Sequence, residues 1–507
     1  MNTHANVTAR GFRFLRSRWR KVLAAGAAAL LTGAALTVAT GTATAAGTGP
    51  CDIYASGGTP CVAAHSTTRA LFGSYGGSLY QVRRWSDGAT ANIGVLSAGG
   101  YANAATQDSF CSGTYCTIVR IYDQTSRHND LTIAPGGGAN PTADQGANAA
   151  ALPVTAGGHK VYGVYISAGN GYRNNNTNGV ATGSAPEGMY MVTEGTHFND
   201  RCCFDYGNAE TSNNDTGNGD MDAIYFGTLC WFSPCSGSAP KVMADLENGL
   251  FAGGNGSNTA NTGRSSAFVT AVTKNNGTST YAIKDGNAQS GGLSTRWNGS
   301  LPTQGGYQPM TKQGAIILGI GGDNSNGSVG SFFEGVMTSG YPSDATENSV
   351  QANIVSVGYA KSVTFPVDGA AYRLTNLAAG KVLDAANCGT ANGTAVQVWQ
   401  NLNNACQQWR FTNVGANKWT ITNVNSGKVL DAVNCGLALG TATDLWQSLG
   451  NKCQQWAVIP AGNGRYELVV ENSGMVLDDQ NCGTANGTKT QMWMWLNNTC
   501  QLWSFSS

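Results

Sequence analysis

Two carboxylates lie two residues apart in the stretch "KVMADLENGLF", where Asp245 and Glu247 interrupt an otherwise apolar segment. If the segment is a strand, alternation places both side chains on one face. Two neighbouring carboxylates repel each other, and such a pair can supply a nucleophile or an acid and a base. A solvated strand face is the alternative interpretation of the same spacing.

A third carboxylate follows the apolar run "AIILGIGG", where Asp323 comes directly after Gly321 and Gly322. Glycine lets the backbone approach a ligand closely, so this position suits a catalytic acid. The alternative is an Asx-turn that Asp323 starts ahead of Asn324. Serine-triad chemistry has little support, because the chain has five His and no Gly-x-Ser-x-Gly elbow.

The elements that must position these residues are predicted to be strands. The 507 residues include 69 Gly and only 11% charged residues, a composition typical of short strands joined by turns. Strand candidates rich in β-branched and aromatic residues are "CTIVRIYD", "KVYGVYIS", "GMYMVTEG" and "AIILGIGG". We therefore expect an all-β fold with a two-sheet sandwich in the N-terminal part.

Residues 1–46 are predicted to be a secretory signal peptide. Six basic residues precede an Ala/Leu/Gly/Thr run that ends in Ala43-Thr44-Ala45, with cleavage expected near Ala45 or Ala46. A membrane anchor is the alternative, but Gly and Thr dilute the run. The prefix holds six of the 29 basic and none of the 29 acidic residues, so the remainder is 23 basic against 29 acidic, about −6. This balance argues against a nucleic-acid surface.

Fourteen cysteines in an exported chain indicate disulfides. Their spacing suggests Cys51 with Cys61, Cys111 with Cys116, Cys230 with Cys235 and three pairs in the last third, which leaves Cys202 and Cys203 with each other. A zinc site is the alternative interpretation of the cysteines. We expect no metal and no cofactor.

The last third repeats itself three times without insertion or deletion. Asp384, Asp431 and Asp478 recur every 47 residues, as do three Cys and the three Trp of Gln-x-Trp. Each unit offers about four short strands and cannot bury its own apolar face alone. Three units closing around an axis can do so.

The repeats resemble the ricin-type β-trefoil, a family 13 carbohydrate-binding module, over about 372–507. The resemblance implies that the Trp of Gln-x-Trp is core and that an Asp and an aromatic ring hold a sugar. The matching residues are Asp384 with Trp399 and Gln407, Asp431 with Trp446 and Gln454, and Asp478 with Trp493 and Gln501. Cysteines 18 apart would close each unit, as Cys388 with Cys406, Cys435 with Cys453, and Cys482 with Cys500.

The segment 49–360 resembles the catalytic domain of the secreted α-L-arabinofuranosidases of type B, glycoside hydrolase family 54. The motifs are "GPCDIYASGGTPCVAAHSTTRAL", "IYDQTSRHNDLT", "CCFDYGNAETS", "ADLENGLF", "GAIILGIGGDNSNG" and "FFEGVMTSGYPSDATENSVQANIV". The resemblance implies a concanavalin-like sandwich and a retaining mechanism. Glu247 would be the nucleophile and Asp323 the general acid/base. Asp245, Asn248 and the backbone at Gly322 would contact the sugar.

The same resemblance implies a role for the adjacent cysteines. Cys202 and Cys203 would form a vicinal disulfide lying against one face of the furanose, and Trp231 would help to wall the pocket. Two reduced thiols are the alternative. Cys230 and Cys235 are an addition near Trp231 that could reshape the pocket rim.

These expectations combine into one reading with three regions: a signal at 1–46, a catalytic sandwich at 47–362 and a trefoil at 366–507. We expect a secreted monomer that removes arabinofuranosyl groups from arabinoxylan or arabinan, with the trefoil on the polysaccharide and no nucleic-acid or membrane partner. The alternatives are a catalytically silent lectin-like binder and a hydrolase of another pentoside such as a β-xyloside.

Overall fold

The computed structural model describes residues 47–361 except 113, and residues 366–506 except 416–417 and 462–463. The predicted signal peptide at 1–46 therefore lies outside the described residues. Within them, no helix is long and apolar enough to cross a membrane. The fold is all-β, as the composition predicted, with most described residues of the regular elements in strands.

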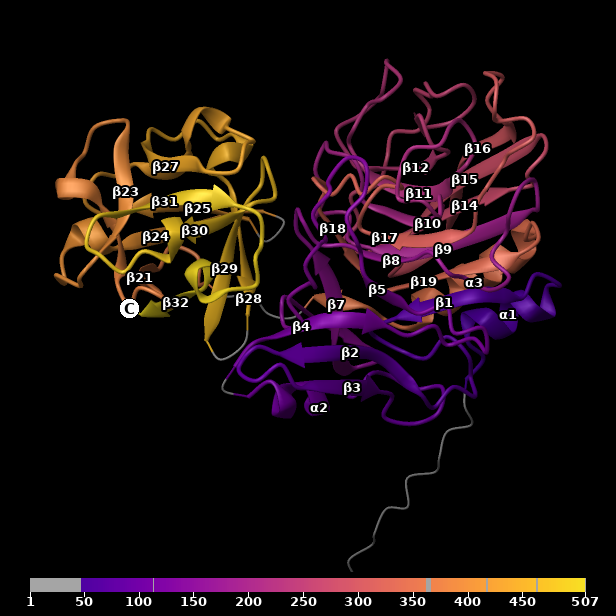
Figure 1. The fold of residues 1–507 in the computed structure, drawn as a ribbon, viewed down its shortest axis with the longest axis horizontal. Coiled ribbons are helices and arrows are strands. Elements are labelled where there is room, and N and C mark those ends of the chain that lie inside the picture. Colours follow the sequence, from indigo (N-terminus) through magenta and orange to yellow (C-terminus); the bar gives the residue numbers. More distant parts are fainter. Residues whose placement is uncertain (1–46, 113, 362–365, 416–417, 462–463, 507) are drawn as a thin grey trace, which may run out of the picture. The chain divides into compact units, whose positions relative to one another are not determined.

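A six-stranded antiparallel sheet forms one layer of the first domain (Figure 1). Its first strand in the chain, β1, pairs with β19 from nearly 270 residues later. In sheet order the strands are β1 (Cys61–Ser66), β19 (Glu334–Ser339), β9 (Glu187–Thr193), β14 (Val269–Asn275), β15 (Thr280–Asn287) and β16 (Ser290–Ser300).

A ten-stranded antiparallel sheet packs against the first and carries the residues of interest at one end. In sheet order its strands are β13 (Leu250–Phe251), β12 (Lys241–Asp245), β11 (Asp222–Gly227), β10 (Asp205–Ala209), β17 (Ala315–Leu318), β8 (Tyr172–Asn174), β5 (Leu131–Ile133), β4 (Cys116–Ile121), β2 (Ser78–Arg84) and β3 (Thr90–Gly94). Side chains from both sheets, among them Tyr190 and Tyr206, share one buried core. The predicted sandwich is confirmed.

A smaller four-stranded sheet and three helices complete the domain. The sheet contains β18 (Gly330–Phe332), β7 (His159–Ile166), β6 (Leu152–Ala156) and β20 (Ala360–Lys361), and the helices are α1 (Pro50–Ser56), α2 (Ala104–Phe110) and α3 (Asp344–Ser356). Glu347 of α3 forms ion pairs with Lys274 and Lys284, so this helix is tied to β14 and β15. All four strand candidates in the sequence contain a strand, although β17 ends at Leu318, before the double glycine.

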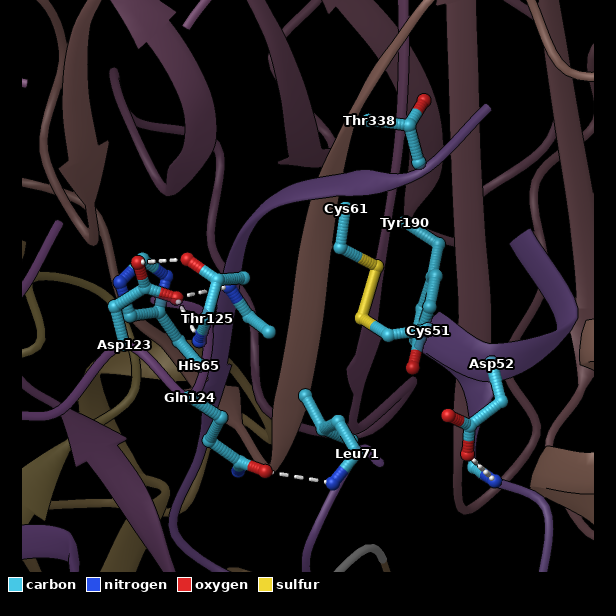
Figure 2. The surroundings of a disulfide bond; sticks show 12 residues. Cys51, Asp52, Cys61, His65, Leu71, Asp123, Gln124, Thr125, Tyr190 and Thr338 are labelled. Atoms are coloured by element: carbon cyan, nitrogen blue, oxygen red, sulfur yellow. Dashed lines mark hydrogen bonds between the residues drawn. A yellow bond between two sulfur atoms is a disulfide. The ribbon is translucent and has the colours of Figure 1, made fainter. Parts of the chain in front are cut away.

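All seven cysteine pairs that the sequence suggested are disulfides. Figure 2 shows the first, which links Cys51 on α1 to Cys61 on β1. Beside it, the Gln124 side chain accepts a hydrogen bond of 2.7 Å from the Leu71 backbone N–H. This disulfide therefore fastens the N-terminal helix to the edge of the six-stranded sheet.

The three repeats form a β-trefoil of four strands each within the described residues. The strands are β21 (Ala371–Asn376), β22 (Val382–Ala385), β23 (Thr394–Trp399), β24 (Trp409–Gly415), β25 (Lys418–Asn423), β26 (Val429–Ala432), β27 (Thr441–Trp446), β28 (Trp456–Pro460), β29 (Arg465–Val470), β30 (Val476–Asp479), β31 (Thr488–Trp493) and β32 (Trp503–Ser506). The central strands β23, β27 and β31 pair with one another, which closes the units on an axis.

Each repeat also has two single-turn 3₁₀ helices, and its Gln-x-Trp tryptophan is core. The helices are Ala386–Cys388, Ala405–Gln407, Val433–Cys435, Lys452–Gln454, Gln480–Cys482 and Thr499–Gln501. Trp409, Trp456 and Trp503 are completely buried. Each indole N–H donates to a backbone carbonyl of its own repeat. The structural role predicted for these tryptophans is confirmed.

Candidate active site

Glu247 lies in the tight turn that joins β12 to β13. Asp245 pairs with Leu250 across the hairpin, and the Leu246 N–H donates to the Gly249 carbonyl. The two central residues, Glu247 and Asn248, both have positive φ, 60° and 41°. Positive φ at both central positions is the pattern of a type I′ turn, which favours Asn, Asp and Gly. A glutamate there adopts a conformation that is often found at functional sites.

The strand alternation expected across Asp245 and Glu247 is wrong, because β12 ends at Asp245 and the chain turns back. The turn nevertheless brings both side chains to the same pocket. The Asp245 carboxylate also accepts a hydrogen bond of 3.2 Å from the Glu247 backbone N–H. The turn, held by the Asp245 side chain, therefore brings Asp245 and Glu247 to one pocket, as a shared strand face was expected to do.

Asp323 lies in the loop that follows β17, where it caps a turn and also lines the pocket. Its Oδ1 accepts a hydrogen bond of 3.0 Å from the Ser325 N–H and another from the Ser325 hydroxyl, so it does cap an Asx-turn. The side chain also lines the pocket with Glu247. The turn holds the carboxylate at the pocket wall.

A second layer of hydrogen bonds holds this loop from behind. The side-chain amides of Asn324 and Asn326 donate to Asp144 Oδ1, at 3.5 and 2.6 Å. The Asp323 backbone carbonyl accepts from Ala139 at 2.9 Å. Burial raises the pKa of Asp144 to about 6, and the two amide donors oppose the shift. Asp144 thus holds the loop that carries Asp323 without itself lining the pocket.

Cys202 and Cys203 form a disulfide that lies beside both carboxylate loops. The Cys203 N–H donates to the Ser325 carbonyl at 3.2 Å, which ties the pair to the Asp323 loop. The Cys203 sulfur lies 3.6 Å from Asp245 Oδ2. The alternative of two reduced thiols is therefore wrong.

The pocket unites the residues predicted for the site. It has a volume of about 80 Å³, and its walls are Cys202, Cys203, Asp215, Met221, Trp231, Asp245, Glu247, Asn248, Gly249, Leu250, Gly321, Gly322, Asp323 and Ser325. Trp231 stands at the rim with 51% of its surface exposed. The Cys230–Cys235 disulfide closes the loop that carries it. An aromatic ring, a disulfide and several carboxylates around one small cavity suit a sugar ring with hydroxyl groups.

Two carboxyl groups of this site, those of Asp245 and Glu247, are shielded from water. Burial raises the pKa of Glu247, and the neighbouring carboxyl groups of Glu210, Asp245 and Asp215 raise it further. Burial also raises the pKa of Asp245, although a hydrogen bond with Asp205 opposes that shift. Low exposure and like charge both favour protonated forms, so the site can hold protons at neutral pH.

Sequence reasoning missed four polar residues in or behind the pocket. Asp215 lines it and accepts a hydrogen bond of 3.3 Å from Asn248 Nδ2. Asp205, Glu210 and Arg173 are buried behind it. Asp205 and Glu210 lie in the motif "CCFDYGNAETS". Two acidic residues beside apolar ones in that motif could have indicated buried carboxyl groups near the site. The sequence around Arg173 gave no indication of a site, because its place behind the pocket depends on the pairing of β8 with β17.

One group in the described residues has metal-ligand geometry, namely Cys202, Cys203 and Asp245. Both sulfur atoms are bonded to each other, so neither is available as a thiolate ligand.

In each repeat of the trefoil, the predicted Asp lies on a strand that pairs with the strand ending at the predicted Trp. In the first repeat Asp384 and Trp399 line a pocket of about 210 Å³ with Asn387, Cys388, Gln397 and Leu402. Asp384 accepts hydrogen bonds of 2.9 Å from Gln397 and 3.1 Å from Gln407. In the third repeat Asp478 accepts at 2.8 Å from Gln491. These donors fix the carboxylates in place.

Gln407, Gln454 and Gln501 are completely buried, which differs from the expected sugar contact. Each Oε1 accepts from the backbone N–H of a leucine five residues earlier, at 2.7 Å. Each Nε2 donates to a backbone carbonyl seven residues earlier. The geometry favours a positioning role for these glutamines over direct contact with a sugar.

The second repeat departs from the other two at the position that faces its predicted sugar-binding Asp. Asp444 stands where the first and third repeats have Gln397 and Gln491, and it faces Asp431 across β26 and β27. Burial raises the pKa of Asp444 to about 6, and the charge of Asp431 raises it too. Like charges on facing strand positions are destabilising. The predicted sugar site of the second repeat therefore differs in charge from those of the first and third repeats.

Comparison with known proteins finds two families in succession along the chain. A sequence profile described as the catalytic domain of α-L-arabinofuranosidase B matches residues 50–360. A ricin-type β-trefoil lectin profile matches the overlapping segments 361–446, 405–493 and 452–507. The two profiles meet at residues 360 and 361, about ten residues before the first trefoil strand.

Three relatives illustrate the similarity. A probable α-L-arabinofuranosidase B of Aspergillus fumigatus is 63% identical over 316 residues, 61% of this chain and 62% of that protein. An arabinofuranosidase/B-xylosidase of Trichoderma koningii is 60% identical over 316 residues, 61% of this chain and 63% of that protein. A crystal structure of an arabinofuranosidase with arabinofuranosyl-α-1,2-xylobiose is 40% identical with a TM-score of 0.77, covering 90% of this chain and 99% of that one.

The match thus spans less than two thirds of the curated relatives' length, and it is concentrated in the sandwich domain. That domain contains the pocket with Glu247, Asp323 and the Cys202–Cys203 disulfide. The chain therefore belongs to the α-L-arabinofuranosidase B family, glycoside hydrolase family 54, and carries a ricin-type β-trefoil lectin domain after its catalytic domain.

Proposed function

We propose that the protein is a retaining, exo-acting α-L-arabinofuranosidase that releases arabinose from side chains of arabinoxylan or arabinan. The observation that carries this proposal is the single pocket in which Glu247 and Asp323 lie together with the Cys202–Cys203 disulfide and Trp231. The small size of the pocket suits one terminal sugar. Family membership and the relatives' printed activities support the substrate class.

In the proposed mechanism, Asp323 in its protonated form donates to the departing glycosidic oxygen while ionised Glu247 attacks the anomeric carbon. Asp323 then takes a proton from the water that releases arabinose. Two inversions give net retention, which requires the two carboxyl groups to stand about 5–5.5 Å apart around the sugar. Asp245 and Asn248, on either side of Glu247, are proposed to bind the sugar hydroxyls.

The trefoil is proposed to hold the enzyme on plant polysaccharide through Asp384, Asp431 and Asp478 and their paired tryptophans. The seven disulfides fit an extracellular enzyme. Secretion through the 1–46 signal, a monomeric state and the domain limits 47–362 and 366–507 remain predictions.

The test is chemical rescue of the nucleophile variant. Glu247→Gly should cut turnover of an aryl arabinofuranoside by several orders of magnitude, because the covalent step loses its nucleophile. Azide should restore activity and give arabinosyl azide of inverted configuration. Asp323→Ala should lose activity without this product. Near-normal turnover of Glu247→Gly without azide would contradict the assignment.

Hydrolysis of a β-xyloside is the second candidate, and one observation favours it. The Trichoderma koningii relative is described as an arabinofuranosidase/B-xylosidase. Comparing kcat/KM for aryl α-L-arabinofuranoside and aryl β-D-xyloside distinguishes the two substrates. A catalytically silent lectin is disfavoured, since both proposed catalytic carboxylates are present in the pocket.

A further inference from the structure

A loop with three consecutive glycines lies against the loop of the proposed acid, Asp323. The glycine loop, residues 135–143, follows β5 and begins with the sequence "PGGGAN". Its two ends lie close together, because the Asp144 backbone N–H donates to the Ala134 carbonyl at 3.0 Å. The residues between these ends are half-buried or exposed. The loop is therefore fixed at its base, and what it contacts depends on the residues at its tip.

Two successive backbone amides of the glycine loop bind two different segments of the pocket wall. The Gly138 N–H donates to the Asn213 carbonyl, and the Ala139 N–H donates to the Asp323 carbonyl, both at 2.9 Å. Asn213 is two residues from Asp215, and both Asp215 and Asp323 line the pocket. The glycine loop therefore joins two pocket loops that are far apart in the chain.

Side-chain amides reinforce both connections. Asn213 Nδ2 donates to the Gly136 carbonyl at 3.2 Å. Asn324 Nδ2 donates to the carbonyls of Asn140 and Thr142, at 3.1 and 3.3 Å. Both of these asparagines have positive φ, 61° and 65°, a conformation that Asn adopts more readily than most residues. Each pocket loop is thus bound to the glycine loop through backbone and side chain together.

Gly137 is the point of closest approach between the three loops. A Cβ atom added to it would meet the backbone carbonyl oxygens of Asn213 and Asp323, each at 2.5 Å, and the Asn324 Cβ at 2.9 Å. These distances lie well inside van der Waals contact, so any side chain here would push the two pocket loops away. Gly137 does not have the positive φ that would itself require glycine. The requirement for glycine at this position is therefore one of space.

The two neighbouring glycines have different surroundings. A Cβ atom at Gly138 would lie 3.1 Å from Asn214 Oδ1, at the end of a side chain, with the next atom at 3.7 Å. A Cβ atom at Gly136 would meet the Pro141 carbonyl oxygen at 2.0 Å, inside the glycine loop itself. Gly137 is therefore the glycine whose missing side chain makes room for the Asp323 loop, and Gly138 offers a matched control.

We propose that Gly137 is a positioning residue for general acid/base catalysis by Asp323. Its missing side chain lets the glycine loop hold the Asp323 loop where the carboxyl reaches the departing oxygen. Gly137 takes no part in proton transfer: Asp323 gives its proton to the glycosidic oxygen in the first step and regains one from water in the second. Misplacing a catalytic group by about 1 Å can cost about 100-fold in rate. The inference rests on the proposed function, in which Asp323 is the acid.

The experiment compares full-length Gly137→Ala and Gly138→Ala with the parent on two aryl arabinofuranosides. A dinitrophenolate leaves without protonation, whereas a methoxyphenol needs the acid. Gly137→Ala should lower kcat/KM about 10- to 100-fold for the methoxyphenyl substrate but no more than about threefold for the dinitrophenyl one. Gly138→Ala should stay within about twofold of the parent on both, because its new methyl group meets only a movable side chain.

Azide tests the second step, in which Asp323 acts as the base. Azide attacks the arabinosyl–enzyme intermediate without needing a base, and the bond to the Glu247 carboxylate breaks. On the dinitrophenyl substrate, Gly137→Ala should therefore form arabinosyl azide of retained configuration, because two inversions have taken place. The parent and Gly138→Ala should form arabinose.

A second variant loosens the same contact without adding volume. Asn324→Gly tolerates the positive φ at this position and loses the side-chain bonds to Asn140 and Thr142. It should show the same dependence on the leaving group, with a loss of about 3- to 10-fold on the methoxyphenyl substrate. Thermal unfolding shows whether each variant folds, and Asn324→Gly decides the question if Gly137→Ala does not.

Two results would overturn the inference. Equal losses on both substrates would mean that Gly137 supports the pocket as a whole and not the acid. Unchanged kcat/KM in folded Gly137→Ala would mean that the Asp323 loop does not depend on this contact. Asp323→Ala in the same assay separates these results from failure of the proposed function. If Asp323→Ala also lacks the dependence on the leaving group, Asp323 is not the acid; if it shows that dependence and Gly137→Ala does not, only the inference fails.

Discussion

At the scale of single residues, the adjacent cysteines are the least ordinary part of the pocket wall. The Cys202–Cys203 disulfide closes no loop, so it constrains the unfolded chain very little. It does supply a fixed apolar surface next to Asp245 and the Asp323 loop. We therefore predict that this disulfide contributes to substrate binding more than to stability.

Replacing both Cys202 and Cys203 with Ala should lower kcat/KM on an aryl arabinofuranoside about tenfold or more, since apolar contact and preorganisation are lost. The melting temperature should change by only a few degrees. Both cysteines must be replaced, because one remaining thiol could exchange with other disulfides.

The matched control is the pair Cys51 and Cys61, which closes a longer loop between α1 and β1. Its double replacement should lower the melting temperature while leaving kcat/KM of the folded enzyme near the parent value. A Cys202/Cys203 variant with unchanged kcat/KM would remove the pair from the substrate site.

At the scale of elements, the trefoil repeats are alike in backbone and different in charge. Gln397 and Gln491 each donate to the binding Asp of their repeat. Asp444 cannot donate to Asp431 once it is ionised, and the rise in its pKa to about 6 shows how unfavourable that state is. Sugar binding by the second repeat should therefore change with pH around 6, whereas binding by the first and third repeats should not.

Asp444→Gln should strengthen polysaccharide binding by the second repeat at pH 7 and should remove its pH dependence. The measurement is affinity electrophoresis in soluble arabinoxylan at pH 5 and pH 7, with the other two sites silenced by Trp399→Ala and Trp493→Ala. Equal retardation with and without the Asp444→Gln substitution at both pH values would show that this position does not control binding.

At the scale of the whole molecule, the described residues from 47 onward belong to one compact unit. The Tyr115 hydroxyl donates to the Asn497 carbonyl, and the Asn148 amide donates to Glu467 and, at 3.2 Å, to the Pro460 carbonyl. Trp495 is buried in the same core cluster as residues of the sandwich. Tests of the trefoil should therefore use substitutions, since deletion would uncover buried groups.

Replacing Trp399, Trp446 and Trp493 together with Ala should lower arabinose release from insoluble arabinoxylan several-fold. The rate on a small aryl arabinofuranoside should remain within about twofold, because the catalytic pocket is untouched. The ratio of the two rates is the readout. Equal losses on both substrates would indicate that the tryptophans support the fold instead of binding polymer.

The distribution of buried acids predicts how stability depends on pH. Burial raises the pKa of Asp144 to about 6, of Asp479 to about 7 and of Glu467 to about 8. In the unfolded chain these groups titrate near pH 4. The native state therefore binds more protons between these values, and the free energy of unfolding falls as pH rises. Two lysines lower the pKa of Asp344 to about 2. Protonation of this group therefore lowers the free energy of unfolding as pH falls below 4.

We expect the melting temperature to be highest near pH 4–5 and to fall by roughly 5–10 °C towards pH 8. Calorimetry across this range is the measurement. Glu467→Gln removes one titrating group at similar volume and should make the slope shallower. A melting temperature that rises from pH 5 to pH 8 would contradict the predicted sign.

The sequence by itself determined the features that depend on neighbours in the chain or on repetition. The 47-residue repeat predicted three equivalent units that close around an axis, because an exact period requires equivalent environments. The resemblance to the ricin-type β-trefoil added the buried tryptophans. Cysteine spacing suggested all seven disulfides, and β-branched runs predicted the strands. The family resemblance led to Glu247, Asp323, Trp231 and the adjacent cysteines as residues of one site.

Tertiary structure decided what depends on contacts between distant segments. It showed that Glu247 lies in a positive-φ turn and not on a strand, because hairpin closure follows Asp245. It placed Glu210 and Arg173 behind the pocket, since only the packing of β8, β10 and β17 brings positions 173, 210 and 322 together. Periodicity indicates which face of an element is buried. Which side chains pack against that face, and what charge they carry, is decided only by the fold.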